Sequence, residues 1–400
     1  MKNVFKKVCA AALTLALGAS MMFSMASCKK ETNYAANNTV FKIGAMGPED
    51  GGAAKYGIAV RNSAQMAVDE INALTNGEFK FELTFLNDSH DATKVAPNYA
   101  NLYESGMQVS LGCVTTRPAL EFAPLSYEDK VFFITPSASG DDVPKYDNGY
   151  QMCFSDSNQG TASAQYFNAN YQGKTVGVIY KSDDPYSSGI FDKFKESLSS
   201  SFALKEASFT GNPASFDSQV SLLSDCDVIF MPLYTEHASL FMKNGVGHIK
   251  NNAVYYGCDG LDGIDTVENF DINSIPQEVS FLSHFNSNAT SGPAYDYVQK
   301  YNARFDEEKE PTNQFGAAAY DCVYAIYEAM KYAKAHGKEL STTMSPAALC
   351  EILQEVFNSD DFVFHGITGE CVGNNKSNIT WESTGYVDKV AVKYVVKPAN

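Results

Sequence analysis

Hydroxyl groups and acids gather in short segments that each follow an apolar run. Residues 112–118 (GCVTTRP) and 135–140 (TPSASG) carry the hydroxyl groups. Residues 180–186 (YKSDDPY), 232–236 (PLYTE) and 257–260 (GCDG) carry the acids. Hydroxyl donors and free backbone N–H groups at the start of a helix suit a carboxylate, because the helix dipole is positive there. An acid facing them across a cleft suits an ammonium group, so the segments together predict a clamp for an α-amino acid. The hydroxyl-rich segments contain Thr115, Thr116, Ser137, Ala138 and Ser139, and Asp259 is one of the candidate acids.

Three of these residues also have a purely structural interpretation. Thr116 and Ser139 stand where helices are expected to begin, and threonine and serine are good N-cap residues. Asp259 is equally suited to cap the helix that follows it. Both interpretations stay open at the level of the sequence.

Other motifs that could carry chemistry are weak. Asp88-Ser89-His90-Asp91 has metal-binding residue types, but it lies between an expected strand and an expected helix, where Asp and Ser act as caps. We therefore favour capping over a metal site. His237 and His284 have no partners at the spacing of a metal site or a catalytic triad. The sequence contains no nucleophile elbow, P-loop or zinc-binding helix pair, so we expect no enzyme activity and no cofactor.

Alternating strand-like and helix-like segments position these loops. Apolar or alternating runs at residues 41–46, 79–85, 107–111 and 131–134 predict strands, and residues 56–73 have helical spacing. Repeated strand–helix units require parallel pairing, since each helix crosses a face of the sheet. Ligands bind at the carboxyl ends of such strands, which is where the hydroxyl-rich loops lie.

A second series of the same kind follows. Residues 175–180, 207–210, 227–233 and 254–257 predict strands, and residues 279–285 predict another. We expect three later helices, at residues 294–305, 315–335 and 346–357, to return to the first series. The alternating end, residues 387–396, predicts a strand in the second. Two lobes are expected, because some 370 residues exceed what one hydrophobic core usually organises.

The first 27 residues have the features of an export signal. Lys2, Lys6 and Lys7 precede an apolar run at residues 8–17 that is too short to span a bilayer. Met25-Ala26-Ser27-Cys28 resembles the lipobox of bacterial lipoproteins, which predicts that Cys28 is the lipidated N-terminus. The alternative is an ordinary secretory signal with Cys28 as a bystander. Residues 28–40 are expected to be the lipidated cysteine and a flexible tether, so the protein would be exported and anchored on the periplasmic or cell-surface side of a bacterial membrane.

Charge and cysteine content narrow the partners. The formal net charge of −17 excludes nucleic acid, because no basic cluster overrides it. No run after the signal is long enough for a membrane helix. Seven cysteines remain besides Cys9 and Cys28, with no CxxC spacing, and we expect most to be small buried residues. Cys350 and Cys371 are the pair to test first for a disulfide.

Several segments resemble one family along most of the chain. They are residues 42–48 (KIGAMGP), 56–62 (YGIAVRN), 67–73 (AVDEINA), 135–139 (TPSAS), 186–189 (YSSG), 227–232 (DVIFMP), 257–260 (GCDG) and 366–369 (GITG). Together they resemble the branched-chain amino-acid-type substrate-binding proteins of ABC transporters. The resemblance covers about residues 41–397.

The resemblance implies the type I periplasmic-binding fold, an α/β fold with two doubly wound parallel-sheet lobes joined by three crossovers. Lobe 1 would comprise residues 41–156 and 286–360, and lobe 2 residues 157–285 and 361–400. It also implies a monomer that captures a small molecule, an amino acid, and delivers it to ABC permease subunits. The alternative is a lipoprotein that senses its ligand and reports to a membrane receptor or kinase.

The resemblance assigns roles to single residues as well. Thr116 and Ser139, with backbone of Thr115 and Ser137, would bind the ligand carboxylate, and Asp259 its α-amino group. Tyr56 would be an aromatic residue at the cleft rim, and Tyr186 and Tyr234 would cover the ligand from the second lobe. Glu49-Asp50 and Arg117 depart from the family pattern. Because they suit a polar or charged ligand side chain, a preference for Leu, Ile or Val is not carried over.

Overall fold

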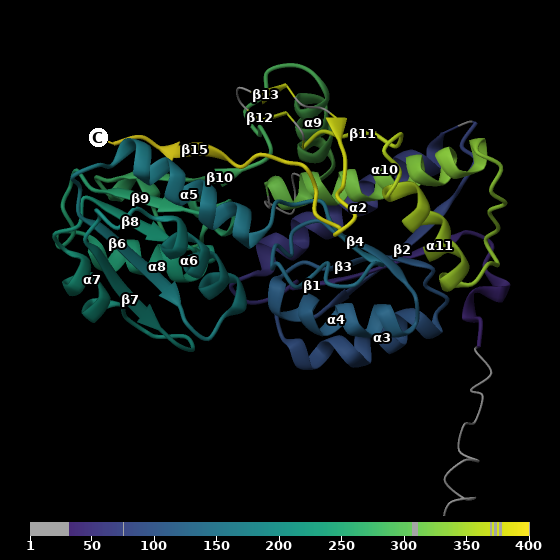
Figure 1. Cartoon of the computed structure of the whole chain (residues 1–400), viewed down its shortest axis with the longest axis horizontal. Coiled ribbons are helices and arrows are strands. Elements are labelled where there is room, and N and C mark those ends of the chain that lie inside the picture. Colours follow the sequence, from purple (N-terminus) through teal and green to yellow (C-terminus); the bar gives the residue numbers. More distant parts are fainter. Residues whose placement is uncertain are drawn as a thin grey trace, which may run out of the picture. The chain divides into compact units, whose positions relative to one another are not determined.

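The structure is a computed structural model that describes residues 32–74, 76–305, 311–368, 370–371, 374–375 and 378–399. Cys28 and the signal segment lie outside these residues. The described chain contains two parallel-stranded sheets, each covered by helices on both faces (Figure 1). This confirms the predicted fold class. We call the parts built on these sheets the first and second lobe.

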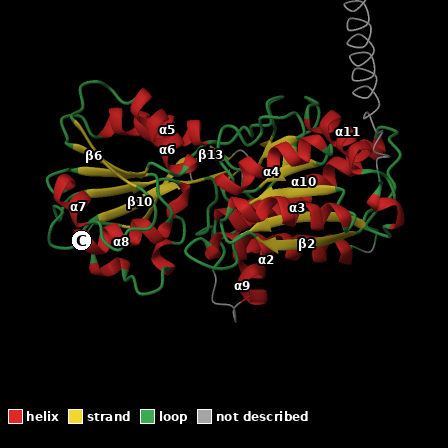
Figure 2. Cartoon of the chain, turned by 90° about the horizontal axis from the view of Figure 1, so that it is seen from below, coloured by secondary structure: helices red, strands yellow, loops and turns green. Residues whose placement is uncertain are grey.

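The first lobe is built on a parallel sheet with strand order β2-β1-β3-β4-β5. Figures 1 and 2 show helices on both of its faces. Helices α3 and α4 pack on one face around Phe122 and Phe133, and α2, α10 and α11 pack on the other around Phe132 and Ile134. The elements are β1 (Phe41–Gly47), α2 (Ala54–Ala73), β2 (Phe81–Asn87), η2 (Ala92–Lys94), α3 (Val95–Glu104), β3 (Val109–Cys113), α4 (Thr116–Glu128), β4 (Phe132–Thr135), β5 (Gly149–Gln151), α9 (Pro293–Phe305), α10 (Gln314–Ala335) and α11 (Pro346–Phe357).

The second lobe is built on a sheet with strand order β15-β10-β9-β8-β6-β7, in which only β15 pairs antiparallel. Helices α5 and α6 pack on one face and α7 and α8 on the other. The elements are α5 (Asp156–Asn170), β6 (Val176–Lys181), α6 (Pro185–Ser197), β7 (Leu204–Phe209), α7 (Asp217–Leu223), β8 (Val228–Met231), α8 (Thr235–Gly245), β9 (Val254–Gly257), η3 (Asp259–Leu261), η4 (Ile264–Thr266), η5 (Ile272–Ser274), β10 (Glu278–Ser283) and β15 (Val392–Lys397).

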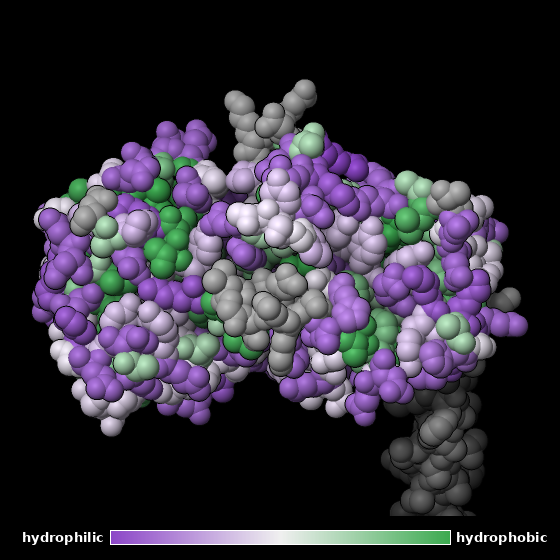
Figure 3. Space-filling model, turned by 90° about the horizontal axis from the view of Figure 1, so that it is seen from above, coloured by the Kyte–Doolittle hydropathy of each residue, from purple (hydrophilic) through white to green (hydrophobic). Residues whose placement is uncertain are grey.

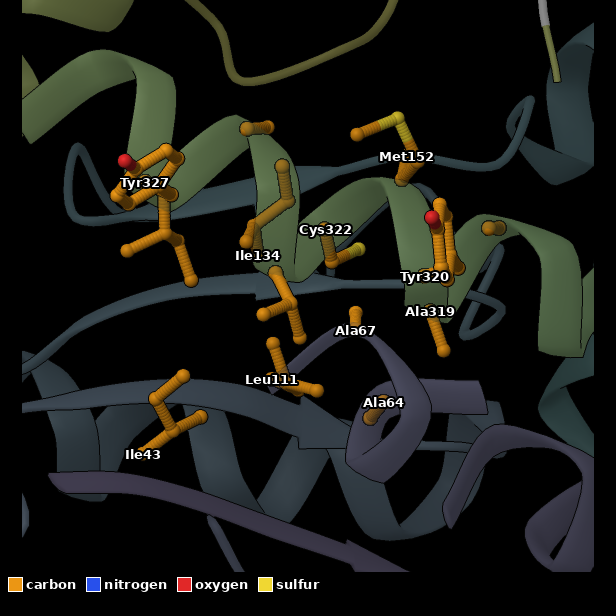
Figure 4. Packing of buried hydrophobic residues seen from close by; sticks show 14 of the residues in the cluster. Ile43, Ala64, Ala67, Leu111, Ile134, Met152, Ala319, Tyr320, Cys322 and Tyr327 are labelled. Atoms are coloured by element: carbon orange, nitrogen blue, oxygen red, sulfur yellow. The ribbon is translucent and has the colours of Figure 1, made fainter. Parts of the chain in front are cut away.

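Small residues let the central helices of the first lobe approach the sheet and each other. Ala64 and Ala67 of α2 lie beside Ala319 and Cys322 of α10, and all four are fully buried (Figure 4). The side chains of β1, β3 and β4 fill the space beneath them. Close packing of this kind leaves no room for larger side chains at the helix contact.

The predicted strands all appear, and the three late helices begin and end within a residue of their predicted positions. The end of the chain joins the second sheet as predicted, where β15 pairs with β10, but this strand begins at Val392 rather than at residue 387. Four two-residue strands in the described part of residues 364–379 were not predicted. Strand β5 was not predicted, because its three residues are too few to show a period. None of the helices in the described residues, including the long α10, is long and apolar enough to cross a membrane. The face in Figure 3 is mostly hydrophilic.

The segment after α11 was expected to belong to the second lobe from residue 361 onward, but most of it packs on the first lobe. Phe362, Phe364 and Ile379 are buried in the same core as α10, and Trp381 Nε1 donates to Gln151 O at 2.8 Å. These residues therefore pack on the first lobe, and only β15 enters the second sheet. The segment forms the short pairs β11 (Phe364–His365) with β14 (Asn378–Ile379) and β12 (Glu370–Cys371) with β13 (Asn374–Asn375).

The beginning of the described chain also differs from the expected tether, which reached residue 40. Residues Tyr34–Asn37 form the 3₁₀ helix η1, and Ala35 is fully buried. Asn38 Nδ2 donates to Gly106 O at 2.8 Å, and Tyr34 packs edge to face on Tyr103. Folded structure thus begins several residues earlier than the lack of an apolar pattern indicated.

Candidate ligand-binding site

The loops at the carboxyl ends of strands from both lobes line one small cavity. Its volume is about 10 Å³, which is the space of about one water molecule. Six of the nine predicted ligand-binding residues line it, three from each lobe. These are Tyr56, Thr115 and Ser137 from the first lobe and Tyr186, Tyr234 and Asp259 from the second, joined by Val114, Gly260 and Phe315.

Asp259 is the carboxylate of this cavity. It is 1 % exposed, Tyr186 Oη donates to its Oδ1 at 2.6 Å, and its own N–H donates to Gln159 Oε1 at 3.0 Å. Burial raises the pKa of Asp259 to about 6, although the hydrogen bond from Tyr186 opposes this effect. The helix that Asp259 was suited to cap is only the three-residue η3, which Asp259 itself begins.

Aromatic rings fill the space between Asp259 and the first lobe. Tyr186 and Tyr234 are stacked, with 4.7 Å between their centroids and 15° between their planes. Phe315 lies edge to face on Tyr56 at 5.1 Å. The Tyr56 hydroxyl donates to Gly260 O at 2.7 Å, so a residue of the first lobe is held by the second.

The hydroxyl-rich loops meet the cavity only in part. Thr115 precedes α4 without a capping hydrogen bond from its side chain. Ser137 Oγ donates to Val114 O at 2.6 Å and thereby ties the two loops together. Thr116 Oγ1 accepts a hydrogen bond from Gly140 N at 3.2 Å, and Ser139 O accepts one from Asp156 N at 2.8 Å. Thr116, Ala138 and Ser139 are buried but do not line the cavity.

Further contacts join the lobes around the cavity. Lys55 Nζ donates to Gly263 O at 3.0 Å. Gln314 N, at the start of α10, donates to Asp262 Oδ2 at 2.9 Å. Arg117 donates to the carbonyl oxygen of Asp183. The structure therefore has its two lobes in contact over the site.

The residues that depart from the family pattern do not line the cavity. Glu49 forms an ion pair with Arg61 at 2.5 Å within the first lobe. Asp50 accepts a hydrogen bond from Asn87 Nδ2 at 2.8 Å. Arg117 contacts the second lobe rather than the cavity.

Sequence reasoning missed His90 and Gln159 as residues of this site. His90 Nδ1 lies 2.8 Å from Thr115 Oγ1, and its ring packs edge to face on Tyr234. The capping interpretation of this motif is confirmed, because Asp91 accepts a hydrogen bond from Thr93 N at 2.9 Å. The available signal was position, since the loop after β2 ends at the same edge of the sheet as the hydroxyl-rich loops.

The described cysteines and acids offer no other obvious site. Six cysteines are free and buried, as expected for small core residues, and Cys350 is one of them. The structure therefore does not contain the disulfide between Cys350 and Cys371 that was the first pair to test. No group of three or more His, Cys, Asp or Glu residues suited to a metal ion occurs in the described part of the chain. A larger cavity, about 700 Å³, lies between α10 and residues 361–367, away from these loops.

Comparison with known proteins decides the family. The periplasmic binding protein family matches residues 40–368. The chain belongs to this family. Membership implies an extracytoplasmic location and a small-molecule ligand, and it confirms that this periplasmic binding protein is not an enzyme.

Two curated relatives show the extent of the similarity. The Leu/Ile/Val-binding protein BraC3 of Rhizobium johnstonii is 27 % identical over 233 residues, covering 56 % of this chain and 62 % of the relative. The leucine-, isoleucine-, valine-, threonine- and alanine-binding protein of Pseudomonas aeruginosa is 26 % identical over 332 residues, covering 78 % of this chain and 84 % of the relative.

Solved structures show the same fold. The leucine-binding protein of Thermotoga maritima superimposes with a TM-score of 0.74 at 23 % identity, covering 90 % of this chain and 96 % of that one. The branched-chain amino acid transporter substrate-binding protein of Streptococcus pneumoniae, in complex with isoleucine, has a TM-score of 0.70 at 25 % identity, covering 90 % and 100 %. A benzoate complex from Rhodopseudomonas palustris shares the fold at 15 % identity, with a TM-score of 0.72 over 90 % of this chain and 97 % of that one.

Proposed function

We propose that this periplasmic binding protein captures an α-amino acid between its lobes and delivers it to the permease of an ABC transporter. Thr116 and Ser139, with backbone groups of Thr115 and Ser137, bind the ligand carboxylate, and Asp259 binds the α-ammonium group. Tyr56, Tyr186 and Tyr234 enclose the ligand. The sequence similarity to binding proteins for leucine, isoleucine, valine, threonine and alanine supports this ligand class.

The buried carboxylate of Asp259 is the observation that carries the proposal. A buried charge is costly unless it is paired, and within the described part of the chain Asp259 accepts a hydrogen bond from Tyr186 but contacts no cation. A ligand ammonium group supplies the missing positive charge. An aromatic acid such as benzoate lacks that charge and therefore fits this site less well.

The residues around the cavity indicate which kind of ligand side chain would fit. Glu49, Asp50 and Arg117 are engaged elsewhere, so they do not supply a charge for it. The cavity wall is instead aromatic, with one histidine at its edge. This favours an uncharged side chain over an acidic or basic one.

The anchor belongs to the same proposal. We expect lipidation of Cys28, which would keep the binding protein next to its permease. Mass spectrometry of the protein purified from its native membrane should find a lipid-modified Cys28 as the first residue. An unmodified residue upstream of Cys28 would contradict the anchor.

The ligand class is tested by identifying what the protein binds. Small molecules released from the purified protein by denaturation are identified by mass spectrometry, and the refolded protein is then titrated calorimetrically with each of the twenty L-amino acids. We expect at least one to bind with a dissociation constant in the micromolar range or below. Binding of benzoate but of none of the amino acids would contradict the proposal.

A further inference from the structure

The loop after β2 brings into the site a histidine that the amino-acid clamp does not use. His90 Nδ1 lies 2.8 Å from Thr115 Oγ1. The His90 ring packs edge to face on Tyr234, with 5.4 Å between the ring centroids. Thr115 belongs to the first lobe and Tyr234 to the second, so His90 contacts one cavity-lining residue on each side.

An uncommon backbone conformation places this ring. Ser89 and His90 have φ angles of 50° and 57°, in the left-handed region that residues other than glycine adopt rarely. Two side chains brace the turn. Asn87 Oδ1 accepts from Ser89 N, and Asp88 Oδ1 accepts from His90 N, both at 2.8 Å. Successive residues in this conformation are found where the surrounding structure dictates a position, and ligand sites are among such places.

His90 is neutral at physiological pH. Burial lowers its pKa to about 4, and the cations Lys181 and Arg117 contribute to the lowering, whereas Asp91 opposes it. A neutral imidazole carries one N–H group, so Nδ1 is either a donor or an acceptor. The hydrogen bond to Thr115 depends on which of the two it is.

The two tautomers give Thr115 opposite properties toward the cavity. If Nδ1 accepts, the Thr115 hydroxyl donates its only hydrogen to His90. Only its lone pairs then face the cavity, and these repel a carboxylate. If Nδ1 donates, Thr115 accepts from His90 and keeps its own proton for the cavity. In the second case, successive hydrogen bonds polarise one another and strengthen the last one.

We propose that His90 is a positioning residue for the ligand carboxylate, whose Nδ1–H group donates to Thr115 Oγ1 and leaves the Thr115 hydroxyl free to donate to the ligand. The inference rests on the proposed function and adds a side-chain role for Thr115, from which only a backbone contact was expected. It also assigns a binding role to the segment of residues 88–91, which otherwise only forms a turn and a helix cap.

The tautomer can be read without any ligand. Nitrogen-15 NMR of histidine-labelled protein at pH 7, with the His90 signals assigned by their loss in His90→Asn, distinguishes a protonated Nδ1 from a protonated Nε2. We expect the Nδ1–H tautomer, and we expect Thr115→Val to shift the Nδ1 signal. A protonated Nε2 with a bare Nδ1 in the folded protein would overturn the proposal, whether or not amino acids bind.

Binding by matched variants gives the second readout. His90→Asn keeps an N–H group near the position of Nδ1 and tolerates the left-handed backbone, whereas His90→Leu removes the donor. For the tightest binder among the twenty L-amino acids, we expect His90→Leu to lose about tenfold in affinity and His90→Asn to lose less than about threefold.

A double-mutant cycle separates positioning from a general disturbance of the loop. Thr115→Val already removes the hydroxyl that would connect His90 to the ligand. Adding His90→Leu to this variant should therefore lower the affinity little further. Losses that simply multiply would overturn the proposal. If no amino acid binds to the wild type, the proposed function fails, and the NMR result still decides the orientation of the His90–Thr115 hydrogen bond.

Discussion

The ligands that Asp259 suits are determined by the burial of its carboxylate. Its carboxylate lies in an almost closed cavity, held by Tyr186 and with Gln159 bound to its backbone. Neither partner is charged, so the protein carries the desolvation cost of this group until a cation arrives. Two predictions at the scale of this residue follow from that cost.

The first concerns the charge itself. Asp259→Asn preserves the shape of the side chain and removes the charge that pairs with the ligand ammonium. We expect the affinity for the bound amino acid to fall by about 2 kcal/mol or more, which is roughly thirtyfold. The melting temperature of the ligand-free protein should change little. Calorimetric titration measures the first effect and a thermal melt the second, and near wild-type affinity would remove the amino-acid assignment.

The second concerns pH. With the lobes in contact and no ligand between them, the pKa of Asp259 is about 6, and a bound ammonium group lowers it because it favours the charged carboxylate. Binding therefore releases a proton below pH 6. Affinity should be constant above that value and fall by up to about tenfold per pH unit below it, until the lower pKa of the complex is reached. Asp259→Asn is the control, since its affinity should lack this dependence.

At the scale of elements, the start of α10 connects the two lobes. Asn313 caps its N–H groups at Phe315 and Gly316 from within the first lobe. The N–H of Gln314 is instead bound by Asp262, which belongs to the second lobe. One helix terminus is thus completed only when the lobes meet.

This arrangement predicts that a cap contributes to closure. Asp262→Ala removes a partner that exists only in the closed state, so ligand affinity should fall by about 1 kcal/mol, roughly fivefold, because opening is no longer opposed. The open form should be unaffected. Asn313→Ala is the matched variant, because it removes a cap inside one lobe and should lower the melting temperature instead. Calorimetry and thermal melts on both variants compare the effects, and equal losses of melting temperature would contradict the closure role.

At the scale of the whole molecule, the described chain crosses between the two sheets three times, after β5, after β10 and before β15, and buried side chains form contacts at these crossovers. Lys389, beside the third crossover, donates to Met152 O beside the first at 2.6 Å. His284, on the second crossover, packs edge to face on Phe154 of the first at 5.1 Å. These contacts lie close to the chain crossings, where a hinge absorbs the backbone change of domain closure.

The small cavity requires such a motion. A space of about 10 Å³ between contacting lobes does not admit an amino acid, so the lobes must part for entry. We expect small-angle X-ray scattering to show a smaller radius of gyration with saturating ligand than without it, because the ligand gains contacts to both lobes only on closure. Asp259→Asn at the same ligand concentration should show a smaller decrease. An unchanged profile for the wild type would contradict ligand-driven closure.

Local patterns in the sequence determined most of the elements and the edge of the sheets where ligand binds. Strand and helix periods depend on neighbouring residues, so β1, α2, α10 and β9 were predictable from them. The parallel pairing then placed Thr115 and Ser137 near each other, because they follow the neighbouring strands β3 and β4 of one sheet. Asp259 follows β9 of the other sheet and reaches them only because the two lobes meet. Even the return of the three late helices to the first lobe followed from the change in the order of strands and helices.

Contacts between distant segments were decided only by the tertiary structure. Strand β5 exists because β4 offers it an edge, and its three residues carry no period of their own. The short apolar stretch around Phe364 packs on the first lobe because the surface of α10 is available there. His90 forms its hydrogen bond with Thr115, which lies 25 positions away along the chain. Asp262 forms its own with Gln314, which lies 52 positions away. Hydrogen bonds over such separations depend on three-dimensional placement, and no local period records it.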